Sequence, residues 1–577
     1  MAPNLRPSEA FRCGSFLIST YVESLVPGCS GGCNPVPFLC RAVFPLELAR
    51  IMQPSEIVLI GVFLSGITTF LLRSGRREQG LPPGPPTVPV LGNTHLLGDG
   101  KDLHLRITQW ASTYGDIFSL KLSSRTMIVL SSATAIKEVV DKKGWAGSSR
   151  PGNYIAEICG TGADSNLLFA TDGPRLKNLR RTLARFFSVQ NAPRYMPTQA
   201  AESTILLHDL MVHPQDFFES IRRYTYSLTK IMTYGRRAPS FADDDVQQFY
   251  SSVDELSHVL APGVYPLFDI FPLFQYLPVP SSAPWRVLAH RVKTLRAGLH
   301  TNMCDSVRCG LTAGNEQSAE CFIGTVLRSD VPEREHHFYS YTGIALLDAG
   351  SDPTAAFLLS LVLVLAVYPE CQMRAWKEID ELVGATHLPT PADLAGLPYI
   401  RALIKETLRF RPQFPMGVHH LMTDETTYKG HHVPKGSIVV LNTYGIFHDP
   451  DVFEDPWIFN PERFLKSEHG TRPGRDANFR DNLIFGGGRR VCPGQSVGRS
   501  TMELTAMRLI WGLKFSGARD PVTGAFISRE LDCYSSDLIM MPRSFICTME
   551  PRSSEHRDVV LQALGEARLY LNRFEGN

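Results

Sequence analysis

The chain has 577 residues, of which 44% are hydrophobic and 20% are charged, and its formal net charge is +1. This is the composition of a globular protein with a large core, and it excludes a disordered chain and a strongly basic nucleic-acid-binding protein. The twelve cysteines form no C-x-x-C pair and no regular framework, which excludes a small disulfide-stabilised secreted domain.

An uncharged apolar run extends from Ile57 to Leu72. As a helix it would be roughly 24 Å long, slightly short of the ~30 Å hydrocarbon core, and its flanking residues can cover the difference. Arg73, Arg76 and Arg77 follow at once, so the positive-inside rule places the rest of the chain in the cytosol. We therefore predict one N-terminal transmembrane helix within a membrane anchor and basic flank at 52–80; a buried core helix is the alternative.

Residues 1–51 precede this anchor and are rich in cysteine and proline. Met52 opens the string M-Q-P-S-E-I-V-L-I, which would be an ordinary N-terminus for a membrane-anchored protein. We expect Met52 to be the functional start and 1–51 to be a removable leader or a gene-model extension. Peptides from 1–51 in the mature protein, detected by mass spectrometry, would refute this. Leu81 to Pro86, L-P-P-G-P-P, predicts a stiff spacer after the anchor.

Two strands and two helices are predicted next. Phe118–Leu122 and Thr126–Leu130 are rich in strand-forming residues and are separated by a short turn, so we expect them to pair. Ala133–Lys142 has a helical pattern. Asp172–Phe187 also predicts a helix, with Asp172 as its N-cap and a proline in its first turn.

A long apolar run, Phe338–Val367, predicts a buried helix rather than a second membrane span, because carboxylates interrupt it and are costly in a membrane. Pro398–Phe410 predicts a further helix. Near the C-terminus, Leu531–Thr548 has the pattern of a β-hairpin. Residues 551–577 form a polar tail with a weakly amphipathic stretch from Val559 to Leu571.

Phe485 to Gly494 is F-G-G-G-R-R-V-C-P-G, and Cys492 is its reactive residue. The glycines allow a tight backbone turn. Arg489 and Arg490 place positive charge beside the sulfur, which favours thiolate over thiol. A helical run from Ser500 to Leu513 follows, so the sulfur is expected just before a helix N-terminus. This arrangement is typical of a metal-binding thiolate; the alternative is a buried structural cysteine.

All five fixed positions of the pattern F-x-x-G-x-R-x-C-x-G are filled, by Phe485, Gly488, Arg490, Cys492 and Gly494. Chance would produce this in a chain of such length with a probability of roughly 10⁻⁴. The stretch resembles the haem-binding loop of the cytochrome P450 superfamily, and the chain is similar to its membrane-bound fungal secondary-metabolism members from about Leu81 to Thr548. The resemblance implies a mainly α fold with a small β lobe, a haem-thiolate catalytic domain at 81–550, and haem b (iron protoporphyrin IX) with Cys492 as the axial thiolate.

The resemblance also implies which residues bind the haem: Arg180, His420, Phe485, Gly488, Arg490 and Gly494. Arg180 matches the arginine of a W-x-x-x-R motif that reaches a haem propionate, whereas Leu176 occupies the tryptophan position. His420 matches a position that often contacts a propionate. His419 stands where a proline is more usual.

On the opposite side of the haem, A-G-S-D-P-T at Ala349 to Thr354 matches the family pattern A/G-G-x-D/E-T-T/S. The match implies that Ala349 and Gly350 form an oxygen-binding groove and that Asp352 belongs to a proton relay. Pro353 occupies the usual threonine position, so the hydroxyl is lost, while proline itself bends the helix. Thr354 can supply a hydroxyl one position later, turned by about 100°.

The remaining motifs are structural. Glu406 and Arg409 lie at i and i+3 of one helix, and the resemblance implies that they form a buried ion network with Arg463. It also implies that three residues line the substrate cavity: Phe414, Met416 and Val418.

The resemblance therefore implies a monooxygenase that uses O2 and NADPH electrons, delivered by an NADPH–cytochrome reductase, to oxidise a small apolar molecule. We expect it in the endoplasmic reticulum membrane with its catalytic domain in the cytosol and with no nucleic-acid partner. Pro353 motivates one alternative, an oxygen-independent haem-thiolate isomerase or dehydratase. The departures at Leu176, Pro353 and His419 motivate another, a degenerate haem-binding protein.

Overall fold

The computed structural model describes residues 74–98, 100–260, 268–330, 332–475, 478–517, 533–535 and 538–575, together with a few residues between 55 and 69. The chain divides into two compact units, Met1–Thr68 and Thr69–Asn577. The predicted leader, 1–51, lies outside the described residues, as does most of the predicted anchor. Within the anchor, Val58, Leu59 and Val62 are helical and their side chains are exposed.

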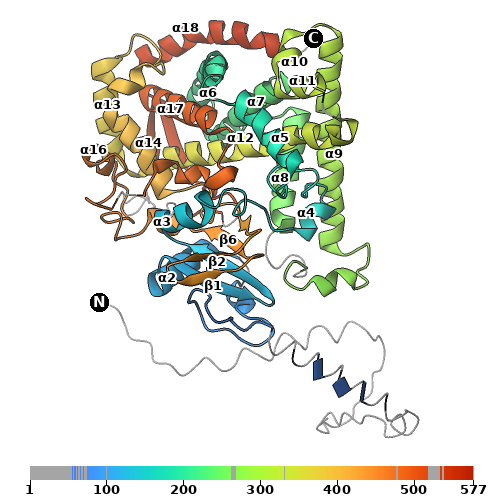
Figure 1. Ribbon diagram of the computed structural model, residues 1–577. Helices are drawn as coiled ribbons and strands as arrows, with labels where there is room; N and C mark the ends of the chain where they lie inside the picture. The colour runs from blue at the N-terminus through green and yellow to red at the C-terminus, as the bar shows by residue number, and fades with distance from the viewer. Residues whose placement is uncertain are drawn as a thin grey trace, which may run out of the picture. The chain divides into compact units, whose positions relative to one another are not determined.

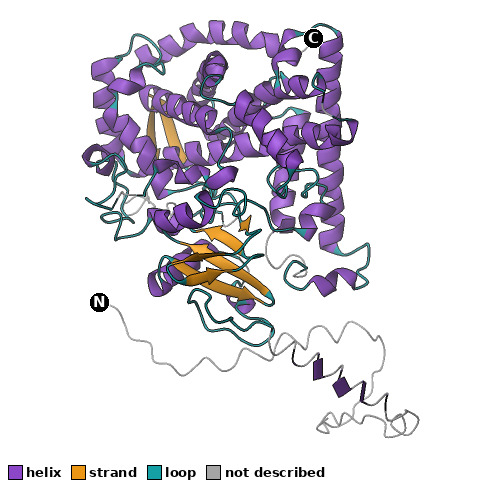
Figure 2. Ribbon diagram, viewed as in Figure 1, coloured by secondary structure: helices purple, strands orange, loops and turns teal. Residues whose placement is uncertain are grey.

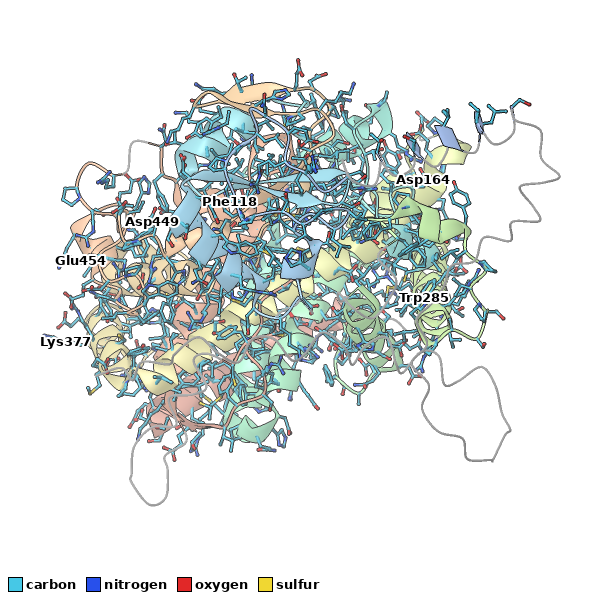
Figure 3. All side chains as sticks on the ribbon, turned by 90° about the horizontal axis from the view of Figure 1, so that it is seen from below. Phe118, Asp164, Trp285, Lys377, Asp449 and Glu454 are labelled. Carbon is cyan, nitrogen blue, oxygen red and sulfur yellow. The ribbon has the colours of Figure 1, made fainter. Side chains whose placement is uncertain are left out.

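A small β lobe begins the larger unit. Its four-stranded sheet has the order β1 (Ile117–Leu122), β2 (Arg125–Leu130), β6 (Ile438–Leu441) and β3 (His420–Leu421). The predicted pairing of the first two strands is confirmed, because β1 and β2 are antiparallel with Phe118 opposite Val129. The β2–β6 pairing is parallel, so it joins chain segments far apart in sequence. Phe118 is fully buried, whereas Lys377 and Glu454 lie at the edge of the molecule (Figure 3).

The rest of the unit is mainly helical (Figures 1 and 2). Its α-helices are α2 (Leu103–Tyr114), α3 (Ala133–Ile136), α4 (Tyr154–Ile158), α5 (Pro174–Phe186), α6 (Met196–Val212), α7 (Phe217–Tyr234), α8 (Asp244–Leu260), α9 (Pro284–Thr312), α10 (Glu316–Glu320), α11 (Phe322–Leu327), α12 (Glu333–Val367), α13 (Pro369–Leu382), α14 (Pro398–Phe410), α15 (Thr443–Phe447), α16 (Arg463–Lys466), α17 (Gln495–Gly512) and α18 (Ser554–Leu571). Two short sheets complete it: β4 (Thr426–Tyr428) with β5 (His431–Val433), and β7 (Leu513–Gly517) with β8 (Cys547–Pro551).

Helix α12 is the central element of the core. It runs for 35 residues, continues through Pro353, and packs against α7, α9, α14 and α17. The part from Glu335 to Val367 is long and apolar enough to cross a membrane, but 83% of its most apolar window is buried inside the protein. The prediction of a buried core helix in this region is therefore confirmed.

Helix α5 begins later than the sequence predicts. Its N-cap is Gly173 and it starts at Pro174, so the prediction of Asp172 as N-cap is wrong. Gly173 has an extended backbone, which places Asp172 one residue too early to cap the first turn. The Asp172 carboxylate instead pairs with Lys177 at 3.2 Å. The predicted helix Ala133–Lys142 is divided into α3 and a π-helical turn, Lys137–Asp141.

The C-terminal region differs from the prediction in two ways. Within the predicted hairpin Leu531–Thr548, the described residues pair antiparallel only around Tyr534 and Pro542. From Cys547 onward the chain forms β8, which pairs with β7 instead. The predicted polar tail, 551–577, contains α18, which packs against α6. Its buried residues Leu564, Ala567, Leu571 and Phe574 join a cluster with Ala201, Ile205 and Ile231.

Candidate functional site

Cys492 lies in a tight loop between a 3₁₀ turn, η8 (Asp481–Phe485), and α17. Its N–H donates to the Phe485 carbonyl at 2.9 Å, which closes the loop. Gly488 has a φ of 61°, in the left-handed region that favours glycine, and a Cβ there would meet a Val140 methyl at 3.0 Å. Gly494 is the N-cap of α17. The loop thus presents the sulfur next to the N-terminus of a helix, as the glycine and proline pattern predicts.

The charge that acts on the sulfur is not the one predicted. Burial raises the pKa of the Cys492 thiol, and the Gly494 N–H and the nearby Arg180 guanidinium oppose this rise without cancelling it. The prediction that Arg489 and Arg490 would favour the thiolate is therefore wrong for the protein alone. Arg490 turns its guanidinium to the Ala170 carbonyl, at 2.8 Å. A coordinating metal ion deprotonates a thiol outright, so the ligand role of Cys492 does not depend on these arginines.

Three arginines gather around this loop: Arg150 and Arg490 are buried, and Arg180 is half-buried. Arg180 of α5 donates to the Val491 carbonyl at 2.5 Å. Arg150 donates to the carbonyls of Val418 and His419, both at 2.7 Å. Burial lowers the pKa of Arg150, and Arg490 and Arg180 lower it further. Burial and Arg180 likewise lower the pKa of Arg490, to about 9. Like charges thus lower the pKa values of Arg150 and Arg490, so the cluster favours an anionic ligand.

The segment Phe414–His420 lies against the same cluster. His420 is buried, and its Nδ1 lies 2.8 Å from the Gly147 carbonyl, which assigns that hydrogen bond to an Nδ1–H donor. Burial and Arg150 lower the pKa of His420 well below its ordinary value, so the ring is neutral. The pKa of His419 falls to about 4 for the same two reasons. Phe414, Met416 and Val418 are half-buried.

Leu176 cannot replace the missing tryptophan. Its side chain is 2% exposed and belongs to the main hydrophobic cluster. It therefore contributes to the core of the domain, and a leucine offers no hydrogen-bond donor in any orientation.

An accessible stripe interrupts the buried surface of α12. Ala349 is exposed, and Gly350, Pro353 and Thr354 are half-buried, whereas Leu347 and Ala355 are fully buried. Gly350 has a packing role as well as a place on this stripe: an added Cβ would lie 2.6 Å from Thr229 Oγ1 of α7. Glycine is therefore needed here for the close approach of two helices.

Asp352 lies on α12 beside this stripe and is 7% exposed. Burial raises its pKa to about 7; Arg222 of α7 opposes the rise, and Asp348 and Asp254 add to it. Among the described residues, Asp352 Oδ1 has no hydrogen-bond partner. The carboxyl group can therefore exchange a proton near neutral pH.

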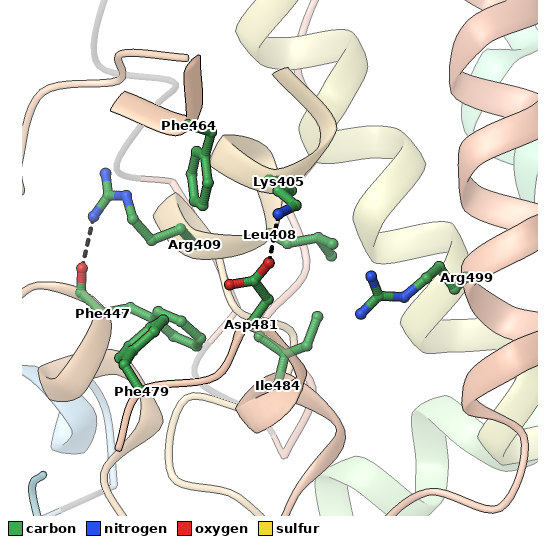
Figure 4. A pocket seen from close by; sticks show the side chains of 9 residues that line it. All are labelled: Lys405, Leu408, Arg409, Phe447, Phe464, Phe479, Asp481, Ile484 and Arg499. Atoms are coloured by element: carbon green, nitrogen blue, oxygen red, sulfur yellow. Dashed lines mark hydrogen bonds and ion pairs between the residues drawn. The ribbon is translucent and has the colours of Figure 1, made fainter. Parts of the chain in front are cut away.

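Glu406, Arg409 and Arg463 form one buried ion network. Arg409 Nε and Nη2 donate to the Glu406 carboxylate at 2.7 and 2.9 Å, and Arg463 Nε lies 3.1 Å from it. The Asn460 N–H donates to the same carboxylate at 2.8 Å. Arg409 Nη1 also donates to the Phe447 carbonyl at 2.6 Å (Figure 4). The network ties α14 to the chain segments that precede the Cys492 loop.

A small cavity of about 20 Å³ adjoins this network. It is lined by residues of α14, η8 and α17, and the Lys405–Asp481 ion pair crosses it at 2.6 Å (Figure 4). The cavity has room for about one water molecule, so it is not a substrate site. The ion pair adds a second tie between α14 and η8.

The cytochrome P450 family model matches residues 82–522. The chain is 35% identical over 508 residues to a cytochrome P450 monooxygenase of Armillaria gallica, which covers 88% of this chain and 96% of the relative. Identity to one from Aspergillus terreus is 32% over 520 residues, covering 89% of this chain and 96% of the relative. A zebrafish cytochrome P450 solved with progesterone has the same fold, with a TM-score of 0.62 at 24% identity, covering 78% of this chain and 99% of that chain.

The chain belongs to the cytochrome P450 family. Haem b is the cofactor of this cytochrome P450, and the residues around Cys492 fit it. The sulfur would ligate the iron, and the three arginine cations would match the two carboxylates of the propionates. The neutral His420 ring has a second nitrogen left for a polar contact.

Arg150 is the residue of this site that the sequence did not reveal. It lies in the string G-S-S-R-P, and the following proline favours an extended backbone at Arg150. An arginine before a proline is too common to single out. Its meaning becomes visible only when the fold brings it to Arg180 and Arg490.

Proposed function

We propose that this cytochrome P450 is a haem-thiolate monooxygenase that uses O2 and reductase-delivered NADPH electrons to oxidise a small, largely apolar secondary metabolite. The observation that carries the proposal is the half-buried Cys492 near one half-buried and two buried arginines, a site that matches both an iron atom and two propionates. The names of the relatives, cytochrome P450 monooxygenases of fungi, support it. They give no support to an oxygen-independent isomerase or to a degenerate protein.

In this proposal the residues around the loop hold the cofactor. Cys492 would ligate the iron, and Arg150, Arg180, Arg490 and His420 would bind the propionates. When bound, haem b supplies the oxygen-activating chemistry. The glycine-rich backbone keeps the sulfur in a fixed position, because the hydrogen bond from the Cys492 N–H to the Phe485 carbonyl closes the loop.

On the other side, Asp352 holds and releases a proton. Its raised pKa, about 7, suits an acid that exchanges protons at cytosolic pH. Pro353 offers no hydroxyl, and Thr354 lies half-buried on the accessible stripe, so Thr354 carries the hydroxyl group toward the reaction space. Ala349 leaves room for dioxygen. Phe414, Met416 and Val418 provide apolar contacts for the substrate.

We further propose that 52–80 anchors the catalytic domain, 81–550, to the cytosolic face of the endoplasmic reticulum, where an NADPH–cytochrome reductase is its electron donor. The uncharged run 57–72 and the basic residues after it support this. Deleting 52–80 should move the protein from the membrane to the soluble fraction of a cell extract. Retention in the membrane fraction after this deletion would contradict the anchor.

The proposed activity is tested in two steps. The ferrous protein with carbon monoxide should show the red-shifted Soret band of a thiolate ligand, and Cys492→Ser should abolish it. Oxidised product should then form only with NADPH and reductase, and should carry label from isotopically labelled dioxygen. A thiolate spectrum together with product that carries no label would refute the monooxygenase reaction.

A further inference from the structure

An ion pair lies beside the accessible stripe of α12. Asp348 directly precedes Ala349, and its carboxylate binds Arg296 of α9. Arg296 Nη1 donates to Asp348 Oδ1 at 3.2 Å, and Nη2 donates to Oδ2. The Arg296 side chain is 0% exposed, but 29% of the Asp348 side chain is exposed. Arg296 therefore covers one side of the Asp348 carboxylate, and the other side is accessible. Asp348 is the residue directly before the accessible stripe.

The Asp348 carboxylate keeps the Arg296 guanidinium charged. Burial alone would lower the pKa of Arg296, but Asp348 and Tyr341 outweigh burial and raise the pKa above its ordinary value. Tyr341 lies two turns before Asp348 on the same face of α12 and is buried. The guanidinium thus stays charged and fixes the carboxylate in place.

Stability does not explain this arrangement. Removing two charges from water costs free energy, and a buried ion pair is often no more stabilising than apolar side chains of similar volume. Arg296 Nε, moreover, has no hydrogen-bond partner among the described residues. Before Asp348 on α12, Ile344 and Leu347 are fully buried and apolar. A charged pair in such surroundings therefore favours a role in binding.

The open side of the carboxylate determines what it can bind. A carboxylate only accepts hydrogen bonds, and each Asp348 oxygen keeps a lone pair after binding Arg296. Since the pair carries no net charge, a neutral donor suits it better than an ammonium group. The neighbouring stripe, with Ala349 and Pro353, is apolar. The matching ligand has an apolar body and a hydroxyl group, and a phenol is the strongest neutral donor of this class.

We propose that Asp348, positioned by Arg296, binds a hydroxyl group of the substrate and makes this enzyme selective for phenolic molecules. The inference rests on the proposed monooxygenase function and defines its substrate class more narrowly. The hydroxyl bound at Asp348 fixes one end of the substrate beside Ala349. The enzyme consequently oxidises a molecule that already carries oxygen, so the reaction follows a step that forms or releases a phenol.

The test compares phenols with their methyl ethers, which have the same ring but no donor. The haem-loaded full chain is titrated with 4-ethylphenol and 4-ethylanisole, and with 2-naphthol and 2-methoxynaphthalene, and the shift of the Soret band gives each Kd. A hydrogen bond to a charged acceptor predicts that each phenol binds about tenfold more tightly than its ether, or better. Asp348→Asn should reduce this preference several-fold.

A second variant distinguishes loss of the binding site from misfolding. Asp348→Leu with Arg296→Met removes both charges, so no unpaired charge stays buried, and it should abolish the preference while keeping the thiolate spectrum. Asp305→Asn is the matched control, because Asp305 lies on α9 in an exposed pair with Arg308 and should change nothing.

The proposal is wrong if the wild type binds phenols and their ethers equally tightly, or if it binds neither. So would a double variant that keeps the wild-type preference. Failure of the proposed function looks different: the wild type would then lack the thiolate band with carbon monoxide, or would form product that carries no label from dioxygen.

Discussion

Replacing Glu406 by glutamine tests how the ion network supports the Cys492 loop. The Glu406 side chain is 0% exposed, and Arg409 and Arg463 are 1% and 6% exposed. Glu406→Gln keeps the shape but leaves two buried guanidinium groups without a counter-charge. Breaking a buried pair in this way costs about 3–5 kcal/mol, because the remaining charge stays desolvated. We expect a lower thermal midpoint and a larger fraction of protein without the thiolate Soret band.

The assay follows unfolding by heat and, in parallel, the ratio of thiolate to non-thiolate bands in the carbon monoxide spectrum. The control is Asp305→Asn, which breaks an ion pair of the same i,i+3 spacing with Arg308 at an exposed site. That change should cost less than about 1 kcal/mol. If Glu406→Gln behaves like the control in both measurements, the network does not hold the loop and the reasoning is wrong.

Four further predictions concern other parts of the molecule. The folded state raises the pKa of Asp352, so between about pH 4 and pH 7 the folded protein binds a proton that the unfolded chain has released. The free energy of unfolding of the wild type should therefore fall by up to about 4 kcal/mol as the pH rises through this range. Asp352→Asn should remove this fall. Arg150→Ala should weaken haem binding by the apoprotein about tenfold or more, since a charge-assisted hydrogen bond to a propionate is lost. Pro353→Thr should raise the yield of product per NADPH consumed, because it places a hydroxyl at the family's usual position, whereas the Thr354 hydroxyl is turned by about 100° from it. Ending the chain at residue 552 should lower the thermal midpoint, because α18 then no longer covers the apolar residues of α6.

Each of these has its own control and contrary outcome. Differential scanning calorimetry over the stated pH range would contradict the Asp352 prediction if wild type and variant showed parallel profiles. Arg175→Ala, at a more exposed position on α5, controls for Arg150 in haem titrations, and equal affinities of the two variants would contradict the propionate role. Unchanged coupling in Pro353→Thr would mean that Thr354 already supplies the hydroxyl. An unchanged midpoint after truncation would show that α18 adds no stability.

The sequence revealed the parts of the site that depend on short, fixed spacings. The Cys492 loop and the Glu406–Arg409 pair are local patterns, and their geometry follows from one turn or one helix. The β1–β2 hairpin was equally local. The N-cap of α5 differs from the prediction by one residue, because the sequence allows a cap at either Asp172 or Gly173 and only the backbone decides between them.

Contacts between distant segments were not predictable in this way. Arg296 and Asp348 are 52 positions apart on different helices, and nothing in either string shows that they meet. The same holds for Arg150, which reaches residues 268 and 269 positions away. Residues 551–577 looked polar because the buried side of α18 is narrow, and a narrow apolar stripe is easily taken for a solvated helix. The sequence predicts an oxygen-binding role for Gly350. Its second role, the close approach of α12 to Thr229 of α7, can be recognised only from the packing of the two helices.

The cluster of Arg150, Arg180 and Arg490 has a consequence for how the protein matures in the cell. A chain that folds before it receives its cofactor must bring three like charges together, and their repulsion opposes this last step of folding. In the proposed haem complex the two propionates would remove this repulsion, so we expect cofactor binding and the last folding step to occur together. Hosts that make the polypeptide faster than they make porphyrin would therefore accumulate a partly open form, sensitive to proteases, and supplying a porphyrin precursor would rescue its yield.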